Sequence, residues 1–184
     1  QALEPLEQML TRMASLTGHL KTFARNSPGG LRERLDLAGV VDQALDLLQA
    51  RLHALDVQLA LYLARPAWVC GDAIRLEQVL INLLSNALDA MADKRYRRLE
   101  IRIEPDAQHW RLSVLDSGGG IAAEDLPRIF DPFFTTKPVG DGLGLGLAIS
   151  YGIVHDAGGQ LLAENVPGGA RLSITLPRDQ EPAC

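Results

Sequence analysis

Four glycines at alternate positions, Gly140, Gly142, Gly144 and Gly146, constrain this chain more than any other feature. Glycine adopts backbone conformations and permits close approaches that a Cβ forbids. Apolar residues at helical spacing follow, and a glycine-rich turn that leads into a helix presents free N–H groups to an anion. The run indicates a phosphate-binding loop, and the alternative is a flexible loop before a core helix. It is neither a Walker A loop, because no Gly-Lys-Ser/Thr follows, nor a dinucleotide fingerprint, because residues 130–139 do not read as a buried strand.

The composition is that of a globular protein that does not bind nucleic acid. Of the 184 residues, 47% are hydrophobic and 22% are charged, which suits one core with an appendage. The formal net charge of -5 disfavours broad attraction to nucleic acid, and an aromatic content of 5% offers few rings for stacking on bases. No apolar stretch approaches the length of a membrane span. Because the chain begins at Gln1 rather than at a methionine, we expect a fragment of a longer protein.

Residues 1–28 predict one long helix that needs a partner. Apolar residues from Leu3 to Phe23 step by threes and fours, close to a heptad pattern. A lone helix cannot bury such a stripe, so we expect a second helix against it, from another copy or from chain absent here. Residues 26–30, Asn-Ser-Pro-Gly-Gly, end the helix. We therefore divide the chain into a helical segment at 1–28, a second domain at 29–178 and a loose tail at 179–184.

The second domain predicts helices and strands in mixed order. Asp36 and Asp72 are suited to cap helices that begin at the residues after them. The expected elements are helices at 37–55, from 73 onward and at 142–157, strands at 57–63, 68–70, 99–103, 110–115, 160–165 and 170–176, and an irregular stretch at 122–141 with one turn near 124–126. Because strands and helices do not alternate strictly, we expect an α+β fold with one layer of helices on a mixed sheet.

Polar residues interrupt the helix that follows Asp72 in a regular row. Gln78, Asn82, Asn86 and Asp89 step by four, four and three, so they share one face and the two asparagine amides are neighbours. Amides on a largely buried helix need partners. They bond either to local backbone and to each other, or they supply oxygens to a Mg²⁺ that also takes phosphate oxygens.

Two further segments carry residue types suited to a ligand. Residues 116–121, Asp-Ser-Gly-Gly-Gly-Ile, form either a plain capped turn or a loop whose carboxylate accepts a hydrogen bond from an exocyclic amine such as that of adenine. Residues 130–137 hold three phenylalanines without clear periodicity, which indicates either a lid that packs reversibly or a hydrophobic anchor. Lys137 is either solvated or placed to reach a terminal phosphate as a point charge.

Taken in order, these segments resemble the ATP-binding domain of sensor histidine kinases. Asn82-Leu-Leu-Ser-Asn86-Ala87 is similar to the N box, residues 116–121 to the first glycine box, residues 130–134 to the F box and residues 142–146 to the second glycine box. The resemblance covers roughly residues 31–177. Residues 133–140 together with residues 142–150 are similar in particular to the sensor kinases of four-carbon dicarboxylate uptake and their nitrogen-regulation relatives.

The resemblance implies a two-layer α/β sandwich of the Bergerat (GHKL) type, preceded by one long dimerisation helix, that binds ATP or ADP with Mg²⁺. It makes Asn86 the main Mg²⁺ ligand, Asn82 a supporting ligand with a part in catalysis, Asp116 the acceptor for the adenine amine, and Lys137 a catalytic residue near the γ-phosphate. The other expected nucleotide-binding residues are Asp89, Gly118, Gly120, Ile121, Phe130, Phe134, Thr136, Gly142, Leu143, Gly144, Leu145, Gly146 and Leu147.

Two positions depart from the pattern of relatives. Asp89 stands where some family members carry a lysine three residues after the Mg²⁺ asparagine, and Lys137 is the candidate to replace that charge. Asn82 stands where the related gyrase and mismatch-repair ATPases have glutamate. Because asparagine cannot act as a general base toward water, this residue favours transfer to a protein acceptor over hydrolysis.

The resemblance implies transfer of the ATP γ-phosphoryl to a histidine on a dimerisation helix, followed by relay to an aspartate of a response regulator. His19 lies on the first helix, but Leu20 and Lys21 follow it where the family acceptor is followed by an acidic residue. We therefore expect the acceptor upstream of Gln1, a fragment that does not autophosphorylate, a homodimer in the full-length protein, and a place in the cytoplasmic portion of an inner-membrane sensor. The alternatives are a non-catalytic nucleotide-binding module and an ATPase of the gyrase or chaperone type.

Overall fold

Five strands form one mixed sheet in the order β2-β4-β5-β7-β6, within the residues that the computed structural model describes, 32–138 and 142–179. The strands are β2 (Gln58–Leu63), β4 (Arg98–Pro105), β5 (His109–Asp116), β6 (Gln160–Val166) and β7 (Gly169–Pro177). β2 runs parallel to β4, and the other neighbours are antiparallel. The predicted mixed sheet is confirmed. The long helix predicted for residues 1–28 lies outside the described residues.

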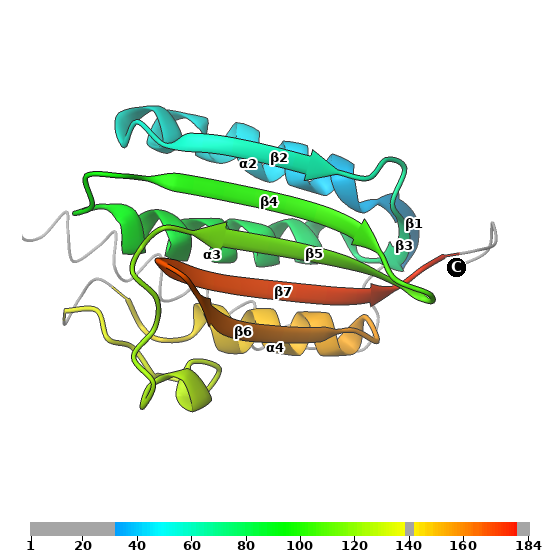
Figure 1. Cartoon of the computed structure of the whole chain (residues 1–184). Helices are drawn as coiled ribbons and strands as arrows, with labels where there is room; N and C mark the ends of the chain where they lie inside the picture. Colours follow the sequence, from blue (N-terminus) through cyan, green and yellow to red (C-terminus); the bar gives the residue numbers. More distant parts are fainter. Residues whose placement is uncertain (1–31, 139–141, 180–184) are drawn as a thin grey trace, which may run out of the picture.

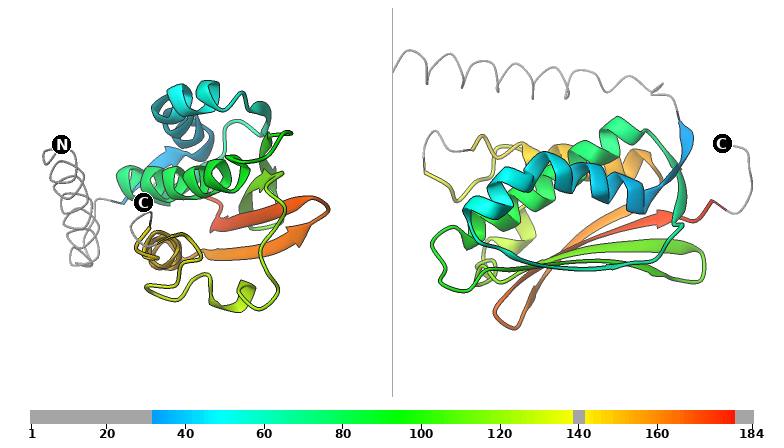
Figure 2. Two further views of the ribbon diagram at one scale, coloured as in Figure 1. Left: turned by 90° about the vertical axis from the view of Figure 1, so that its left-hand side faces the viewer. Right: turned by 90° about the horizontal axis from the view of Figure 1, so that it is seen from above.

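Three helices cover one face of this sheet, which gives the two layers seen in Figures 1 and 2. They are α2 (Leu37–Ala54), α3 (Ala73–Met91) and α4 (Gly146–Asp156). Both predicted caps are present: the Asp36 carboxylate accepts a hydrogen bond from the Ala38 N–H at 3.1 Å, and the Asp72 carboxylate accepts one from the Arg75 N–H at 3.1 Å. The predicted α+β sandwich is therefore confirmed. No helix in the described ranges combines the length and apolarity that a membrane span requires.

The core lies between α3 and the central strands. Alternate residues of β4, Leu99, Ile101 and Ile103, face the helices and are almost completely buried, as strand geometry requires. They belong to one core together with a leucine-rich face of α3, which includes Leu83 and Leu88, both fully buried. Burying one such side chain contributes about 2 kcal/mol relative to leaving it exposed. This packing fixes α3 against the sheet, so its polar row has a defined position.

A second, two-stranded ladder was only half predicted. β3 (Trp68–Gly71) matches the expected strand, but its antiparallel partner β1 (Glu33–Asp36) was not expected. The β1 sequence is Glu-Arg-Leu-Asp, and only Leu35 is buried. Its strand conformation therefore comes from pairing with β3 rather than from an apolar alternation that could be read in the sequence.

Two predicted boundaries differ from the structure. α4 begins at Gly146, not at residue 142, because Gly144 has a left-handed φ of 66° that a right-handed helix cannot include. The turn expected near 124–126 is present at 123–125 and leads into a short 3₁₀ helix at Leu126–Arg128. Asp179, where a loose tail was predicted to begin, is held in place. Its N–H donates to the Trp68 main-chain oxygen at 2.9 Å, and its carboxylate pairs with Arg34 at 3.1 Å.

Candidate functional site

One row of α3 residues contacts three different segments in turn. Asn82, Asn86 and Ala90 are spaced by four residues, so they lie one above the other on one face of the helix. Asn82 contacts α4, Asn86 contacts the segment that carries Lys137, and Ala90 lies against the first glycine loop. Three of the four motif segments that the sequence singles out therefore pack against the fourth.

The first contact joins α3 to the start of α4. The Asn82 Nδ2 donates one hydrogen bond to the main-chain oxygen of Gly146 and another to the Ser150 Oγ, both at 3.2 Å. Ser150 is fully buried, and a buried hydroxyl needs such a partner. The Asn82 amide thus bonds to a neighbouring helix, a use that the sequence did not predict, while its Oδ1 takes no part in these bonds.

The second contact brings a cation to Asn86. The Lys137 Nζ lies 3.3 Å from the Asn86 Oδ1 and also donates to the Asp89 Oδ2. The other oxygen of Asp89, Oδ1, accepts from the Arg51 Nη2 of α2. Burial acts to raise the pKa of Asp89, but the hydrogen bonds from Lys137 and Arg51 outweigh it and hold the pKa below its usual range. Asp89 is therefore a charged link between two basic side chains at neutral pH.

The third contact places a buried carboxylate beside α3. Asp116 ends β5 with 8% of its surface exposed, and its Oδ1 accepts a hydrogen bond from the Gly118 N–H at 2.7 Å. Burial raises the pKa of Asp116, and the N–H groups of Gly118 and Ala170 offset part of that rise. A Cβ on Gly118 would lie 2.6 Å from the Cβ of Ala90, so only glycine permits this approach of loop to helix.

The rest of the glycine loop is held by the opposite edge of the sheet. Gly119 and Gly120 have φ values of 97° and 88°, which other residues rarely adopt. Beyond them the Ile121 N–H donates to the Asn165 Oδ1 at 2.8 Å, and the Asn165 Nδ2 donates to the Ile121 oxygen at 2.7 Å. Sequence reasoning missed Asn165 of β6, because a single asparagine in a polar hairpin gives no signal of a partner 44 residues away.

The F segment, which we define as residues 130–138, packs against α4, and its Phe130 also packs against the main core. The Phe130 ring centroid lies 5.6 Å from that of Tyr151, and the Phe134 ring lies under the Arg128 guanidinium at 4.7 Å. Phe133 is 71% exposed and has a left-handed φ of 67°. Phe130 and Phe134 are both half-buried and fit a hydrophobic anchor, whereas Phe133 does not.

The second glycine segment is packed on the F segment. The Phe133 N–H donates to the Gly144 oxygen at 2.9 Å, and a Cβ on Gly144 would lie 2.4 Å from the Phe134 oxygen. Gly142 lies near Lys137, because a Cβ on it would lie 3.2 Å from the Lys137 Cδ. Of the remaining predicted binding residues, Leu145 is buried, Leu147 is half-buried, and Thr136 and Leu143 are exposed. Gly140, the first glycine of the run, lies outside the described residues.

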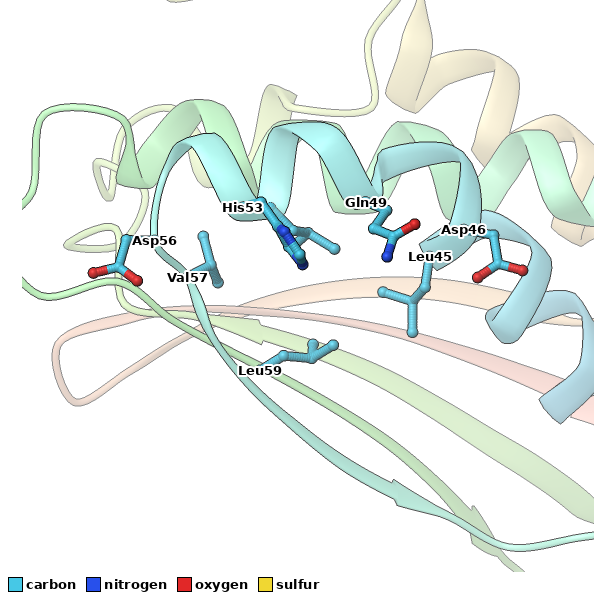
Figure 3. A pocket seen from close by; sticks show the side chains of 8 residues that line it. Leu45, Asp46, Gln49, His53, Asp56, Val57 and Leu59 are labelled. Carbon is cyan, nitrogen blue, oxygen red and sulfur yellow. The ribbon is translucent and has the colours of Figure 1, made fainter.

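A sizeable cavity of this fold does not lie at the α3 row of Asn82, Asn86 and Ala90. A cavity of about 570 Å³ lies between α2 and the edge strand β2, where Leu45, Gln49 and His53 face Leu59 (Figure 3), and it includes none of the predicted site residues. A second cavity, of about 460 Å³, lies where β4 and β5 meet the glycine loop and is lined by Asp116, Ser117 and basic side chains that include Lys94. We place the site by its chemistry, beside the α3 row and Asp116.

The described residues offer no ready-made metal centre. No group of three or more His, Cys, Asp or Glu side chains in them could hold a metal ion. A divalent cation at Asn86 would therefore need further oxygens from a bound ligand, as is usual for Mg²⁺ bound together with phosphates.

Known proteins share both the sequence and the fold. The sequence model of the family described as "Histidine kinase-, DNA gyrase B-, and HSP90-like ATPase" matches residues 71–180. The C4-dicarboxylate transport sensor protein DctB of Pseudomonas aeruginosa is 38% identical over 177 residues, and that of Rhizobium meliloti is 38% identical over 182 residues. The alignments cover 95% and 96% of this chain but only 29% and 28% of those relatives. The chain thus spans less than a third of their length.

Solved structures give the same answer. The catalytic domain of histidine kinase ThkA superposes with a TM-score of 0.73 and 30% identity, over 80% of this chain and 97% of that domain. Histidine kinase ThkA in complex with response regulator protein TrrA superposes with a TM-score of 0.78 and 25% identity, over 97% of this chain and 52% of that chain. The chain therefore belongs to the family of histidine kinase-, DNA gyrase B- and HSP90-like ATPases, and within it to the ATP-binding catalytic domains of sensor histidine kinases.

Proposed function

We propose that this chain transfers the γ-phosphoryl of ATP to a histidine on a dimerisation helix, for relay to an aspartate of a response regulator. The observation that carries the proposal is the contact of Lys137 with Asn86, which sets a lysine ammonium beside an amide oxygen on α3. An ammonium can neutralise phosphate charge, and an amide oxygen can ligate a cation that binds with the phosphates. Catalysis of phosphoryl transfer is mainly such positioning and charge neutralisation.

Asp116 is suited to the adenine end of the nucleotide. An ionised carboxylate has about four acceptor positions. The N–H groups of Gly118 and Ala170 use two of them, so capacity remains for an exocyclic amine. The loop is held on both sides, by Ala90 of α3 and by Asn165 of β6, which makes the carboxylate a fixed acceptor. We infer that the adenine amine donates to Asp116.

The Asn86 oxygen fits a role as Mg²⁺ ligand. It already faces a positive group, the Lys137 ammonium, so the site presents an oxygen to a cation. Asn86 would hold the ion with phosphate oxygens, and the Oδ1 of Asn82 one turn away would support it. When bound, Mg²⁺ would neutralise charge on the phosphates. The backbone of residues 142–146 would lie along the same phosphates.

The residues at the row favour transfer over hydrolysis. Asn82 has no carboxylate with which to activate water. Asp89 does have one, but both of its oxygens are held, by Lys137 and by Arg51, and its pKa is lowered, which makes it a weak base. These side chains therefore suit phosphoryl transfer, as in histidine kinases, better than ATP hydrolysis, as in gyrase-like ATPases.

The acceptor and the partners are proposed from the relatives. The matched relatives are named as sensor proteins, and ThkA has been seen with response regulator TrrA. We infer that the acceptor histidine lies upstream of Gln1, that the full-length protein is a homodimer in which residues 1–28 form the second dimerisation helix, and that the chain is the cytoplasmic portion of an inner-membrane sensor. His19 lies outside the described residues and is not the proposed acceptor.

Radiolabelled ATP tests the transfer directly. The chain is incubated with γ-labelled ATP and Mg²⁺, alone and with a helical fragment taken from the part of Pseudomonas aeruginosa DctB that precedes the matched region. We expect label on the added fragment and none on the chain. Self-labelling that is abolished by His19→Gln would overturn the acceptor assignment. Steady hydrolysis without the fragment, at about 1 s⁻¹ or faster, would favour an ATPase instead.

A further inference from the structure

Asp89 bridges two basic side chains that come from different parts of the fold. Its Oδ1 accepts from the Arg51 Nη2 on α2, and its Oδ2 accepts from the Lys137 Nζ on the F segment. Arg51 is 38 residues before Asp89, and Lys137 is 48 residues after it. Each of the three side chains is between a third and two-fifths exposed. The bridge therefore lies at the rim of the row that holds Asn82 and Asn86, where a bound phosphate chain could reach it.

We propose that Asp89 and Arg51 are positioning residues for Lys137, which deliver its ammonium to the terminal phosphate of ATP. This inference rests on the proposed function. On α3 this chain has an anion, and the cation beside it comes from the F segment. Asp89 thus fixes the end of a long side chain that would otherwise sample many rotamers, and such preorganisation strengthens binding.

Arg51 offsets the negative charge of Asp89, so Asp89 does not neutralise the positive charge of Lys137. Two cations and one carboxylate give the cluster of Arg51, Asp89 and Lys137 a formal charge of +1. Without Arg51 the remaining ion pair would be neutral and its attraction for phosphate would fall. The Lys137 ammonium has three N–H donors, of which Asn86 and Asp89 take one each, so one remains for a phosphate oxygen. Arg51, which would not itself touch the nucleotide, should therefore increase the preference for ATP over ADP.

The ratio of Mg-ATP affinity to Mg-ADP affinity is the readout, because only ATP carries the γ-phosphate. Arg51→Met keeps an unbranched apolar side chain of similar reach while it removes the charge. We expect it to lower the ratio by about threefold to tenfold, the effect of one nearby charge at a partly exposed site. Arg65→Met is the matched control: Arg65 pairs with Asp42 at 2.7 Å through a surface ion pair away from the row. It should leave the ratio unchanged.

A rescue experiment separates positioning from simple support of the fold. Lys137→Met should lower the ratio, and adding Asp89→Lys to that variant should restore it, because the cation then returns to α3. The positioning role of Arg51 and Asp89 is wrong if Lys137→Met lowers the ratio, Arg51→Met leaves it at the parent value, and adding Asp89→Lys to Lys137→Met does not restore it. The proposed function stands in that case. If the unaltered chain binds neither nucleotide, the proposed function itself fails.

Discussion

The side-chain amide of Asn82 donates to the main-chain oxygen of Gly146, the first residue of α4, at 3.2 Å. The same nitrogen donates to the buried Ser150 one turn further along α4. The start of α4, and with it the second glycine segment, therefore takes its position from α3. The F segment follows, because Phe133 is bonded to Gly144. One amide thus links the motif on α3 to the last two motifs of the chain, the F segment and the second glycine segment.

Asn82→Ala should destabilise the domain. Two hydrogen bonds are lost and the Ser150 hydroxyl loses a partner, at a cost of about 1–2 kcal/mol in the free energy of unfolding. Urea denaturation followed by circular dichroism measures it. Gln78→Ala, one turn earlier in the same row and without a hydrogen-bond partner among the described residues, is the control and should change stability by less than about 0.5 kcal/mol. Equal effects of the two substitutions would mean that the Asn82 bonds contribute nothing.

Gly144→Ala should disrupt the packing of the two motif segments. A left-handed φ of 66° costs a residue with a Cβ about 1–2 kcal/mol, and the new Cβ would also meet the Phe134 backbone oxygen. We expect nucleotide affinity to fall at least about tenfold, as measured by calorimetry. Gly152→Ala inside α4 is the matched control: a Cβ there meets nothing within 4 Å, so helix propensity should raise stability by about 0.5–1 kcal/mol. A Gly144→Ala chain that binds nucleotide normally would contradict this description of the segment.

Asp116→Asn should separate function from stability. Burial raises the folded-state pKa of Asp116 above its unfolded value, so the folded state favours the proton and ionisation of this group at neutral pH opposes folding. The amide removes that penalty and still accepts from the Gly118 N–H. The variant should therefore be as stable as the parent at pH 7, or more stable. It should bind adenine nucleotides about tenfold to a hundredfold more weakly, because a charge-assisted hydrogen bond is lost.

The pH dependence of binding follows from the same shift. As pH falls, Asp116 takes up its proton at a higher pH than an ordinary aspartate, so adenine-nucleotide affinity should begin to weaken before ordinary aspartates are protonated. Titrations of the parent between neutral pH and the unfolding limit measure it. The Asp116→Asn chain should lack this phase. A variant with the same pH profile as the parent would exclude Asp116 as the acceptor.

Local patterns predicted most of the fold, and the ordered motifs predicted the family. Asp36 and Asp72 could be recognised as caps because capping depends on residues a few positions apart. The row of Asn82 and Asn86 could be read because helical spacing alone aligns them. The contact of Arg51 with Asp89 could not be predicted, because an arginine on a helix surface is expected to be solvated and only the tertiary fold brings Asp89 to it. The predicted start of α4 at residue 142 was wrong for a related reason: alternating glycine and leucine residues do not reveal that Gly144 has a positive φ.

The charge at Asp89 shows what sequence comparison and geometry each contribute. The sequence identified a departure from relatives and named Lys137 as the candidate replacement. The structure places the Lys137 ammonium against that carboxylate, which a linear pattern could not show for residues 48 positions apart. The same contact sets Lys137 beside Asn86, so the two side chains proposed to meet the phosphates are neighbours.

Calorimetric titration with a non-hydrolysable ATP analogue, with and without Mg²⁺, tests the central claim most directly. The parent chain should bind one nucleotide, and Mg²⁺ should tighten binding. Asn86→Ala should lose the Mg²⁺-dependent part of the affinity while its circular dichroism spectrum and thermal midpoint stay close to those of the parent. Binding of the analogue to Asn86→Ala with the Mg²⁺ dependence of the parent would contradict the assignment of this row as the nucleotide site.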